Sequence, residues 1–585
     1  MGRASTKNLP LLFLIAARGG SRRIPGKNLR TVAGIPLVAR AVRTARLAAN
    51  LVPGGPHAVV CSTDDPVIAA VAADWGAEVP FLRPVELSDE RAASGDVALH
   101  ALDVLEAVGR VFRALVLVQP TSPLTEPGDL RDAVARFDGG RGRRAVVAVT
   151  PSHPASWHTE LVERDIGALI MVAGSGEHLL SGAFYIVDPA SLRLTRRFVL
   201  PGRTSGFEIP AERSVDIDEP ADLTVAEAFA AARPCRTVDV AGRTIGDGPC
   251  FVIAEAGVNH DGDPERAHRL VDAAADAAAD AVKFQTFDAA ALAAADAPLA
   301  EYQRAAASVA SGQREMLARL ALPRDAWPAL AAHARERGIV FLSSPFDAGS
   351  ADLLEDVGVP AYKVPSGELT NHPFLALLAG KGRPLLVSTG MADIREVAAA
   401  LDVIAAAGDP PVALFHCVSS YPAASADANL RAMGTLRAAF GIPTGWSDHT
   451  TGLEMPIAAV ALGADLLEKH LTLDRSLPGP DHRASLEPGE FGAMVAGVRA
   501  VREALGSGVK VPTAAELETA AVARKSLHWG RDLDGGTVVR AEHLVALRPG
   551  TGLSPARLRD LVGRRLARAV TAGARAASVD VEADP

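Results

Sequence analysis

Positive charge is concentrated near the start of the chain, directly after an apolar run. Residues 18–30 read RGGSRRIPGKNLR, with five cations and no acid. Glycines let a backbone approach a ligand closely, and Lys and Arg supply the counter-charge, so this loop suits a triphosphate. A basic loop is often only a solvated surface segment, but its position after the first strand of an α/β sheet favours a ligand site.

Two carboxylates near residue 217 could bind a magnesium ion. Asp216 and Asp218 stand two positions apart in the segment SVDID, and on a strand such side chains face the same side. One Mg²⁺ that bridges to nucleotide phosphates takes one or two protein carboxylates. An isolated pair of this kind also caps loops, so the residues alone leave both interpretations open.

A second set of reactive side chains follows residue 250, each member near the end of an apolar run. The set comprises Glu255, Asn259, His260, Lys283, Gln285, Ser344, Lys363, Ser366, Ser388, Tyr421, Ser447, Asp448, His449, Glu468 and His470. Lysines and hydroxyls that converge suit a small phosphorylated and carboxylated substrate. His449 and His470 can bind one divalent ion and leave positions open for substrate. Lys283 or Lys363 could instead form a Schiff base, as in an aldolase.

In the region that must position the basic loop, strand-like runs alternate with Ala-rich helical runs. This alternation predicts an open α/β sheet. The predicted strands are Leu11–Ala16, Ala58–Ser62, Ala114–Val118, Ala145–Thr150 and Ala183–Val187. Residues 232–248, with several Gly and Pro, interrupt this rhythm and mark a domain boundary.

Eight further strand-like runs, each ending in polar residues and separated by helical stretches, predict a (β/α)₈ TIM barrel. They are Phe251–Gly257, Ala281–Phe287, Val340–Phe346, Ala361–Gly367, Pro384–Gly390, Val412–Pro422, Ile442–His449 and Leu466–Leu473. Such barrels carry their chemistry at the C-terminal ends of the strands. The long gap at residues 288–339 predicts a helical insertion.

From about Arg524 the sequence changes to short β-like pieces with Gly turns, which predicts a small third domain. It is joined through a linker around residues 506–511. The predicted domains are therefore residues 1–232, 240–508 and 521–580.

Composition excludes several classes of protein. With 60 basic and 69 acidic residues, the net charge of −9 argues against a nucleic-acid-binding or membrane-surface protein. The 4 cysteines lie far apart without a C-x-x-C pair, so we expect no zinc site or disulfide framework and a cytoplasmic location. No apolar run approaches the ~20 residues of a membrane span. Residues 9–17 are followed at once by cations, which favours a first strand over a signal peptide.

Residues 10–230 resemble the CMP-sialic acid synthetase (acylneuraminate cytidylyltransferase) family. The matching pieces are the basic loop, Cys61-Ser62-Thr63-Asp64, Arg83-Pro84 with Leu87, Gln119-Pro120-Thr121-Ser122-Pro123-Leu124 and the D-I-D segment. The resemblance implies that the anomeric hydroxyl of a nonulosonic acid attacks the α-phosphate of CTP and releases pyrophosphate. By the same resemblance, the triphosphate is bound by Arg18, Ser21 and Lys27, the nucleotide and sugar by Asn28 and Gln119, and Mg²⁺ by Asp216 and Asp218.

Departures from that family keep an alternative open. Thr125 stands where the family usually has Arg, Ser181 stands where it often has Asn, and the region before Ser181 lacks the usual Arg/Gln-rich stretch that contacts the sugar. The alternative is that the first domain binds a nucleotide in a regulatory role without turnover.

Residues 240–575 resemble the sialic acid synthase family. Seven motifs occur in order: EAGVNH from residue 255, KFQTF from 283, SGE from 366, STGM from 388, SDHT from 447, EKH from 468 and GPDH from 479. The resemblance implies that phosphoenolpyruvate condenses with the open-chain aldehyde of a six-carbon N-acetylated sugar, giving a nine-carbon 2-keto acid and phosphate.

That resemblance also implies residue roles. The carboxylate and phosphate would be held by Lys283, Lys363, Ser344, Ser366 and Ser388, with Gln285 and Ser447 as further substrate contacts. Glu255 and Glu468 would move protons and position water, Asp481 and Tyr421 would orient sugar hydroxyls, and His449 and His470 would bind Mn²⁺ or Mg²⁺.

The last domain resembles the antifreeze-like (SAF) domain of the same family. There it reaches into the barrel of a partner subunit, which implies a homodimer, and Arg548 in Leu547-Arg548-Pro549-Gly550 matches the arginine that contacts the amino-sugar. A surface-turn arginine is the alternative interpretation of Arg548.

Overall fold

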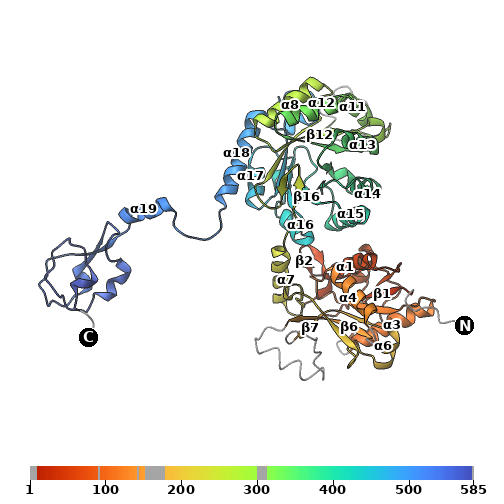
Figure 1. Cartoon of the computed structure of the whole chain (residues 1–585), viewed down its shortest axis with the longest axis horizontal. Coiled ribbons are helices and arrows are strands. Elements are labelled where there is room, and N and C mark those ends of the chain that lie inside the picture. The colour runs from red at the N-terminus through yellow and green to blue at the C-terminus, as the bar shows by residue number, and fades with distance from the viewer. Residues whose placement is uncertain are drawn as a thin grey trace. The chain divides into compact units, whose positions relative to one another are not determined.

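The computed structural model describes residues 9–89, 92–140, 144–151, 178–299, 303 and 312–582. The chain divides into two compact units, residues 1–504 and 505–585. Figure 1 shows the first unit to contain an open sheet and a barrel. Within the described residues, no helix is long and apolar enough to cross a bilayer.

The open sheet has six strands in the order β4-β1-β5-β7-β6-β8. Its strands are β1 (Leu11–Ala16), β4 (Ala58–Ser62), β5 (Ala114–Val118), β6 (Ala145–Pro151), β7 (His178–Val187) and β8 (Thr204–Glu208). All five predicted strands are present, and β8 is an addition. Only β7 runs antiparallel to its neighbours β5 and β6, and β1 pairs in parallel with β4 and β5.

Helices cover both faces of this sheet, so its central strands are buried on both sides. They are α1 (Leu37–Leu51), α2 (Pro66–Asp74), α3 (Ser94–Ala107), α4 (Pro127–Gly139), α6 (Pro189–Thr195) and α7 (Pro220–Ala232), with a small β2 (Thr31–Val32) and β3 (Ile35–Pro36) hairpin. Alternate residues of β1 join two different cores: Phe13 packs in one and Leu14 in the other. This two-sided burial explains why the strand is a continuous apolar run instead of an alternating one.

Residues 214–218 are irregular, so the strand geometry that would turn Asp216 and Asp218 to one side is not present. Asp216 and Asp218 flank buried Ile217 in an irregular connection. The backbone N–H groups of Asp218 and Glu219 donate to the Asp222 carboxylate at 2.8 and 2.7 Å. These donors cap the start of α7 and are therefore not available for pairing with a strand.

The predicted barrel is confirmed as a closed ring of eight parallel strands. They are β11 (Phe251–Gly257), β12 (Ala281–Thr286), β13 (Val340–Pro345), β14 (Tyr362–Val364), β15 (Leu385–Ser388), β16 (Val412–Cys417), β17 (Thr444–Asp448) and β18 (Leu466–His470). A hairpin of β9 (Val238–Val240) and β10 (Arg243–Ile245) precedes the ring.

Helices surround the barrel (Figure 1). They are α8 (Pro264–Asp276), α9 (Ala289–Leu292), α11 (Gln313–Leu320), α12 (Ala326–Glu336), α13 (Ala348–Val357), α14 (His372–Gly380), α15 (Ile394–Ala407), α16 (Ala432–Phe440), α17 (Glu454–Ala461) and α18 (Pro488–Ala504). The described part of the predicted insertion at 288–339 is indeed helical, forming α9, α11 and α12.

The interior of the barrel is layered along the strands. Its lower layer, toward the strand N-termini, is apolar and includes the hairpin: Val238, Val240, Ile245, Phe251, Ile253, Ala281, Leu342, Ala361, Leu386, Ala413, Phe415 and Leu466. Two residues further along a strand, the side chain again faces the interior. There Ile253 is followed by Glu255, Ala281 by Lys283 and Leu466 by Glu468, so a charged layer lies directly above the apolar one.

The second unit is a small β structure preceded by α19 (Ala514–Ala523). Strands β19 (Ser526–Trp529) and β20 (Leu544–Leu547) pair antiparallel. Its core gathers around fully buried Trp529 and includes Leu561 and Leu566. Short β pieces with turns are thus present here, as the sequence texture predicts.

Candidate active sites

A cavity of about 550 Å³ opens beyond the ends of β1 and β5. Its lining includes Arg18, Ser21, Arg22, Arg23, Lys27, Asn28, Arg83, Leu87, Asp89, Ser94, Gln119, Thr121 and Asp218. The structure therefore brings together every predicted residue of the first domain except Asp216, which does not line the cavity.

Local backbone geometry holds the basic loop against the sheet. Asn28 Nδ2 donates to the Arg18 carbonyl at 2.9 Å, and the Gly19 N–H donates to Asp64 Oδ1 at 3.0 Å. A Cβ on Gly19 would lie 2.8 Å from Asp65 Oδ2, so only glycine fits there without displacing that carboxylate. The close packing of Gly19 on the segment after β4 is what keeps the loop cations at the cavity.

The two candidate magnesium ligands differ in their surroundings. Asp218 lines the cavity and accepts from Lys27 Nζ at 3.0 Å, and Arg23 lies 3.9 Å away. Burial raises the pKa of Asp216, although a hydrogen bond from Thr121 opposes the change. Nearby, the Ile217 N–H donates to the Thr121 carbonyl at 2.8 Å, which fixes this segment beside the loop that follows β5.

Arg83 is a cavity residue to which the sequence analysis gave no role. It is only 6% exposed, and its guanidinium donates to the Ser62 hydroxyl at 3.1 Å and to the Ser62 carbonyl. Burial lowers its pKa. A buried cation that lines a cavity is a ligand candidate, and the Arg83-Pro84 match to the cytidylyltransferase motif was the signal that could have identified it.

In the barrel, two glutamates and two lysines form a buried ionic layer. Lys283 Nζ lies 2.7 Å from Glu255 Oε2 and 3.8 Å from Glu468 Oε2, and Lys363 Nζ lies 3.0 Å from Glu468 Oε1. All four side chains are at most 4% exposed. The layer therefore contains two lysines and two glutamates in close contact.

Serine and glutamine side chains complete that layer. Gln285 Nε2 donates to Glu255 Oε1 at 2.9 Å, Ser447 Oγ donates to Glu468 Oε1 at 3.0 Å, and Lys283 Nζ donates to Ser344 Oγ at 3.3 Å. Ser366 Oγ accepts from the Gly390 N–H at 3.0 Å and contacts Cys417 Sγ at 3.2 Å. Ser388 Oγ is buried and has no hydrogen-bond partner among the described residues.

The environment moves the pKa values of the two glutamates in opposite directions. Burial raises the pKa of Glu255, with Glu468 adding to the effect and Lys283 opposing it. For Glu468, burial acts upward too, but the two lysines outweigh it and lower the pKa to about 2. Burial also lowers the pKa of Lys363, whereas Glu255 and Glu468 outweigh burial at Lys283 and raise its pKa. Two carboxyl groups whose pKa values are moved apart in this way can divide the roles of general acid and general base.

Above the ionic layer, His449 and His470 face each other, with ring centroids 5.5 Å apart. The Tyr421 ring lies against both, at 4.2 and 5.9 Å. His449 Nδ1 donates to the Val418 carbonyl at 2.7 Å, which leaves Nε2 with a free lone pair. His470 Nδ1 is buried, without a hydrogen-bond partner among the described residues.

These two imidazoles fit a divalent ion. Burial lowers the pKa of both rings, so they are neutral near pH 7 and present lone pairs. Across the described ranges, no group of three or more His, Cys, Asp or Glu side chains is arranged for a metal. An ion held by two imidazoles keeps further positions open for substrate and water.

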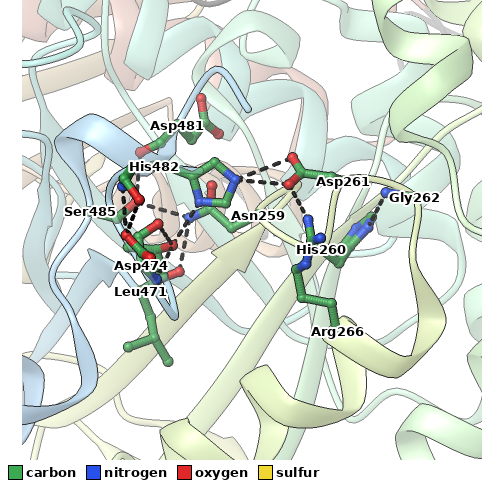
Figure 2. Close-up of polar contacts among 12 residues, drawn as sticks. Asn259, His260, Asp261, Gly262, Arg266, Leu471, Asp474, Asp481, His482 and Ser485 are labelled. Atoms are coloured by element: carbon green, nitrogen blue, oxygen red, sulfur yellow. Dashed lines mark hydrogen bonds and ion pairs between the residues drawn. The ribbon is translucent and has the colours of Figure 1, made fainter. Parts of the chain in front are cut away.

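The loop after β18 carries Asp481 and is tied down by its neighbours (Figure 2). His482 contacts Asp261 Oδ2 at 3.1 Å with one ring nitrogen and Thr472 Oγ1 at 2.7 Å with the other. Asn259 Nδ2 donates to the Ser485 hydroxyl at 2.9 Å. Burial raises the pKa of Asp481 to about 6. These ties were not predicted, because Asp261 and His482 are far apart in the sequence.

Arg548 lies in the second unit, exposed, in the turn that follows β20. Nothing in that unit by itself assigns it to a site, so its role stays a prediction.

An α/β sheet with a basic cavity and a barrel with a buried ionic layer define an enzyme with two separate active sites. The NeuB family model matches residues 270–510, and a cytidylyltransferase model matches residues 12–147. The chain is similar to the N,N'-diacetyllegionaminic acid synthase of Legionella pneumophila, with 45% identity over 328 residues, 55% of this chain and 92% of that protein. The chain belongs to the NeuB family and carries a cytidylyltransferase domain before the family's barrel.

Two further relatives have lower sequence identity to this chain. The pseudaminic acid synthase of Campylobacter jejuni is 32% identical over 327 residues, 56% of this chain and 95% of that protein. A crystal structure of N-acetylneuraminic acid synthetase from Leptospira borgpetersenii has 34% identity and a TM-score of 0.43, covering 49% of this chain and 95% of that one.

Proposed function

We propose that the barrel condenses phosphoenolpyruvate with the open-chain aldehyde of an N-acetylated six-carbon sugar. The products are a nine-carbon 2-keto acid and phosphate, and the cavity of the first domain then transfers CMP from CTP to that acid and releases pyrophosphate. The observation that carries the proposal is the buried layer of paired lysines and glutamates beneath His449 and His470. It provides cations for an anionic substrate and carboxyl groups for proton transfer in one enclosed place.

Lys283 and Lys363 bind the carboxylate and phosphate of phosphoenolpyruvate. Each ammonium group has three N–H donors, so it can contact the substrate while keeping its glutamate. The Ser344 and Ser388 hydroxyls lie on β13 and β15, and Ser366 follows β14, the strand between them. Since Ser388 Oγ is buried without a partner in the described structure, a bound oxyanion would satisfy it.

Glu255 moves the proton in the condensation. C3 of phosphoenolpyruvate attacks the aldehyde carbon, and the aldehyde oxygen takes a proton from Glu255, the carboxyl group whose pKa is raised by burial. Water then adds to C2 and gives one proton to Glu255; as the C2 hydroxyl becomes the keto oxygen, the C2–O bond to phosphate breaks and the hydroxyl proton leaves with the phosphate. Glu468 stays ionised, because its pKa is about 2, and accepts a hydrogen bond from the water. Atoms and protons balance over the cycle.

Residues at the barrel mouth orient the sugar. His449 and His470 would hold Mn²⁺ or Mg²⁺, which when bound supplies Lewis-acid polarisation of the aldehyde. Asp481 and Tyr421 contact sugar hydroxyls, with Asp481 held by the loop ties described above. Gln285 fixes the orientation of Glu255.

In the first domain, Arg18, Ser21 and Lys27 bind the triphosphate of CTP. Asn28 and Gln119 contact the nucleotide and the acceptor sugar, and Asp216 and Asp218 hold the Mg²⁺ that accompanies CTP. The excess of cations around the cavity supports this assignment, because charge develops on the departing pyrophosphate.

For the sugar, we propose a precursor of a diacetylated legionaminic-type acid. The support is identity: 45% and 41% to two N,N'-diacetyllegionaminic acid synthases, against 35% to the human N-acetylneuraminate-9-phosphate synthase and 32% to a pseudaminic acid synthase.

We also propose that the protein is a homodimer in which the second unit, as a SAF domain, brings Arg548 to the partner's barrel. The exposed position of Arg548 in a turn supports this role, because a cation there is free to contact a sugar on another subunit.

The test uses the purified full chain with each step measured separately. Phosphate release is followed with phosphoenolpyruvate, Mn²⁺ or Mg²⁺ and a panel of N-acetylated and di-N-acetylated hexoses, and each product is weighed by mass spectrometry. Pyrophosphate release is followed with CTP and authentic nonulosonic acids. Phosphate release with no sugar of the panel would contradict the first assignment.

A second candidate for the first domain is a nucleotide-binding regulatory module without turnover. The observation in its favour is Thr125, which is buried and donates to the Ser122 carbonyl at 3.0 Å, so it adds no cation to the cavity. This candidate predicts that CTP binds but that no tested acid releases pyrophosphate.

A further inference from the structure

A fully buried ion pair stands next to the two imidazoles at the barrel mouth. Asp448 Oδ2 and Lys469 Nζ lie 2.5 Å apart, and both side chains are 0% exposed. In sequence, Asp448 directly precedes His449 and Lys469 directly precedes His470. Asp448 and Lys469 are also register partners across β17 and β18. The pair therefore links the ends of the two strands that carry the histidines.

This pair lies on the outer side of the strands, away from the ionic layer. Along β17, Ser447 faces the interior and contacts Glu468, and side chains alternate along a strand, so Asp448 faces the helices. Lys469 alternates with Glu468 in the same way. Its neighbours Leu467 and Leu471, together with Trp446 of β17, belong to the apolar core between barrel and helices.

An ion pair in an apolar core does little for stability. Removing two charges from water is costly, and apolar residues of similar volume are often as stable or more so. A role in geometry accounts better for charges at this position.

The contacts of the pair fix the backbone on both sides of His449. Asp448 Oδ1 accepts from the Thr450 N–H at 2.9 Å and from the Thr450 hydroxyl at 2.8 Å. Lys469 Nζ donates to the Thr450 carbonyl. His449 therefore lies between Asp448, a member of the pair, and Thr450, which is hydrogen-bonded to both members. The Val418 carbonyl orients the His449 ring.

We propose that Asp448 and Lys469 are positioning residues that set the spacing of His449 and His470 for a divalent ion. The inference rests on the metal site of the proposed function. Neither residue touches the substrate or the ion; the pair acts by holding the strand ends that present the two imidazoles. Partners of this kind change metal affinity by about 10- to 100-fold when they are lost.

The experiment measures Mn²⁺ affinity of the full chain by isothermal titration calorimetry without CTP or sugar. The variant is Asp448→Asn with Lys469→Met, which removes both charges and the link between strands but keeps an acceptor for Thr450. His470→Ala identifies the heat that belongs to the barrel site. We expect the double variant to bind Mn²⁺ at least about 10-fold more weakly than the wild type.

The matched control is Asp280→Asn, which alters a buried carboxylate that pairs with two partly exposed arginines at the opposite end of the barrel. Asp280 accepts from Arg243 and Arg499 at 2.5 Å each and from the Val252 N–H at 2.7 Å. A merely structural effect would change Mn²⁺ affinity equally in both variants, so the control should stay within about twofold of the wild type.

Mn²⁺ binding by the double variant within about twofold of the wild type would overturn the inference while leaving the metal site intact. If the wild type and His470→Ala bind Mn²⁺ alike, the metal assignment of the proposed function fails instead. Should the double variant not fold, Thr450→Val removes only the hydroxyl donor to Asp448. It should weaken Mn²⁺ binding by about threefold, and an unchanged affinity would overturn the inference.

Discussion

Both proposed active sites bind phosphate groups, but their electrostatics differ. One site has an excess of cations, whereas in the other the cations are paired with carboxyl groups. The cavity of the first domain is open to solvent, and its cations Arg18, Arg22, Arg23, Lys27 and Arg83 outnumber its carboxylates. The barrel site is enclosed, and its two lysines are already in contact with two glutamates.

The difference shows how each site suits its ligand. A polyanion such as a triphosphate needs excess positive charge, and an open loop held by Gly19 and Asn28 supplies it. A smaller anion that must also exchange protons needs lysines and carboxyl groups together, and burial keeps their interactions strong.

The largest expected effect is the separation of the two activities. Lys27→Ala should lower the rate of pyrophosphate release by the first domain at least about 100-fold, because it removes a cation proposed to bind the triphosphate. It should leave phosphate release by the barrel unchanged. His470→Ala should abolish phosphate release by the barrel and leave pyrophosphate release unchanged when nonulosonic acid is supplied to the first domain. Both rates are measured on each variant, and loss of both activities in either one would contradict separate sites.

A mixing experiment tests whether only the barrel site is shared between subunits. Arg548→Ala and His470→Ala should each be inactive in phosphate release. In a mixed dimer with exchanged second units, one site combines an intact His470 with an intact Arg548. Unfolding and refolding an equal mixture should therefore restore about a quarter of wild-type phosphate release, since half the dimers are mixed and each has one intact site.

The outcome has a clear alternative. No recovery, from a mixture shown by sedimentation to be dimeric, would place Arg548 and His470 of one site in the same subunit. Full activity of Arg548→Ala by itself would remove Arg548 from the site. Pyrophosphate release by the same mixture is the internal control.

Burial of His260 should contribute an acid-sensitive part of the stability of the fold. Burial lowers the pKa of His260 from 6.5 to about 4, so the unfolded state binds more protons below pH 6.5. This contribution to stability is complete above about pH 6.5 and is lost as the pH falls toward 4. It amounts to about 3 kcal/mol at most, and buried His449 and His470 act in the same direction.

Urea unfolding between pH 7 and 4.5 measures this effect. In the wild type, His260 Nδ1 accepts a hydrogen bond from the Gly262 N–H at 3.1 Å. In His260→Asn, the amide oxygen can still accept this hydrogen bond. The variant should lose less stability than the wild type over that range. Equal losses would show that His260 is not a source of the acid sensitivity.

The smallest expected effect is in salt dependence. Between about 0.05 and 0.5 M salt, the KM for CTP should rise about threefold or more, because ions screen the exposed cations of the cavity. The KM for phosphoenolpyruvate should change less than about twofold, because the ionic layer is buried. Steady-state kinetics at constant free Mn²⁺ or Mg²⁺ measure both, and equal dependence would remove the contrast between the sites.

The strands and the barrel could be predicted because each strand is an apolar run that ends in polar residues. The upper layer of the barrel followed from the same pattern, since Lys283 and Glu468 occupy inward positions two residues beyond apolar ones. The pairing of each lysine with a particular glutamate could not be predicted. That depends on ring closure, which places β18 beside β11.

The irregular backbone at residues 214–218 has a local cause. Asp216 and Asp218 fit an alternating pattern, but Asp222 captures the backbone donors to cap α7. Arg83 was not given a role although Arg83-Pro84 is one of the matching motif pieces, because the sequence does not show that its guanidinium is buried against Ser62.

The central claim is that one chain makes and activates the same nine-carbon acid. The most direct measurement supplies the pure protein with ¹³C-labelled phosphoenolpyruvate, a di-N-acetylated hexose, Mn²⁺, Mg²⁺ and CTP, and follows the label by mass spectrometry. The account predicts a labelled CMP-nonulosonate, with phosphate and pyrophosphate released in equal amounts. A labelled free acid that accumulates while CTP remains unconsumed would contradict it.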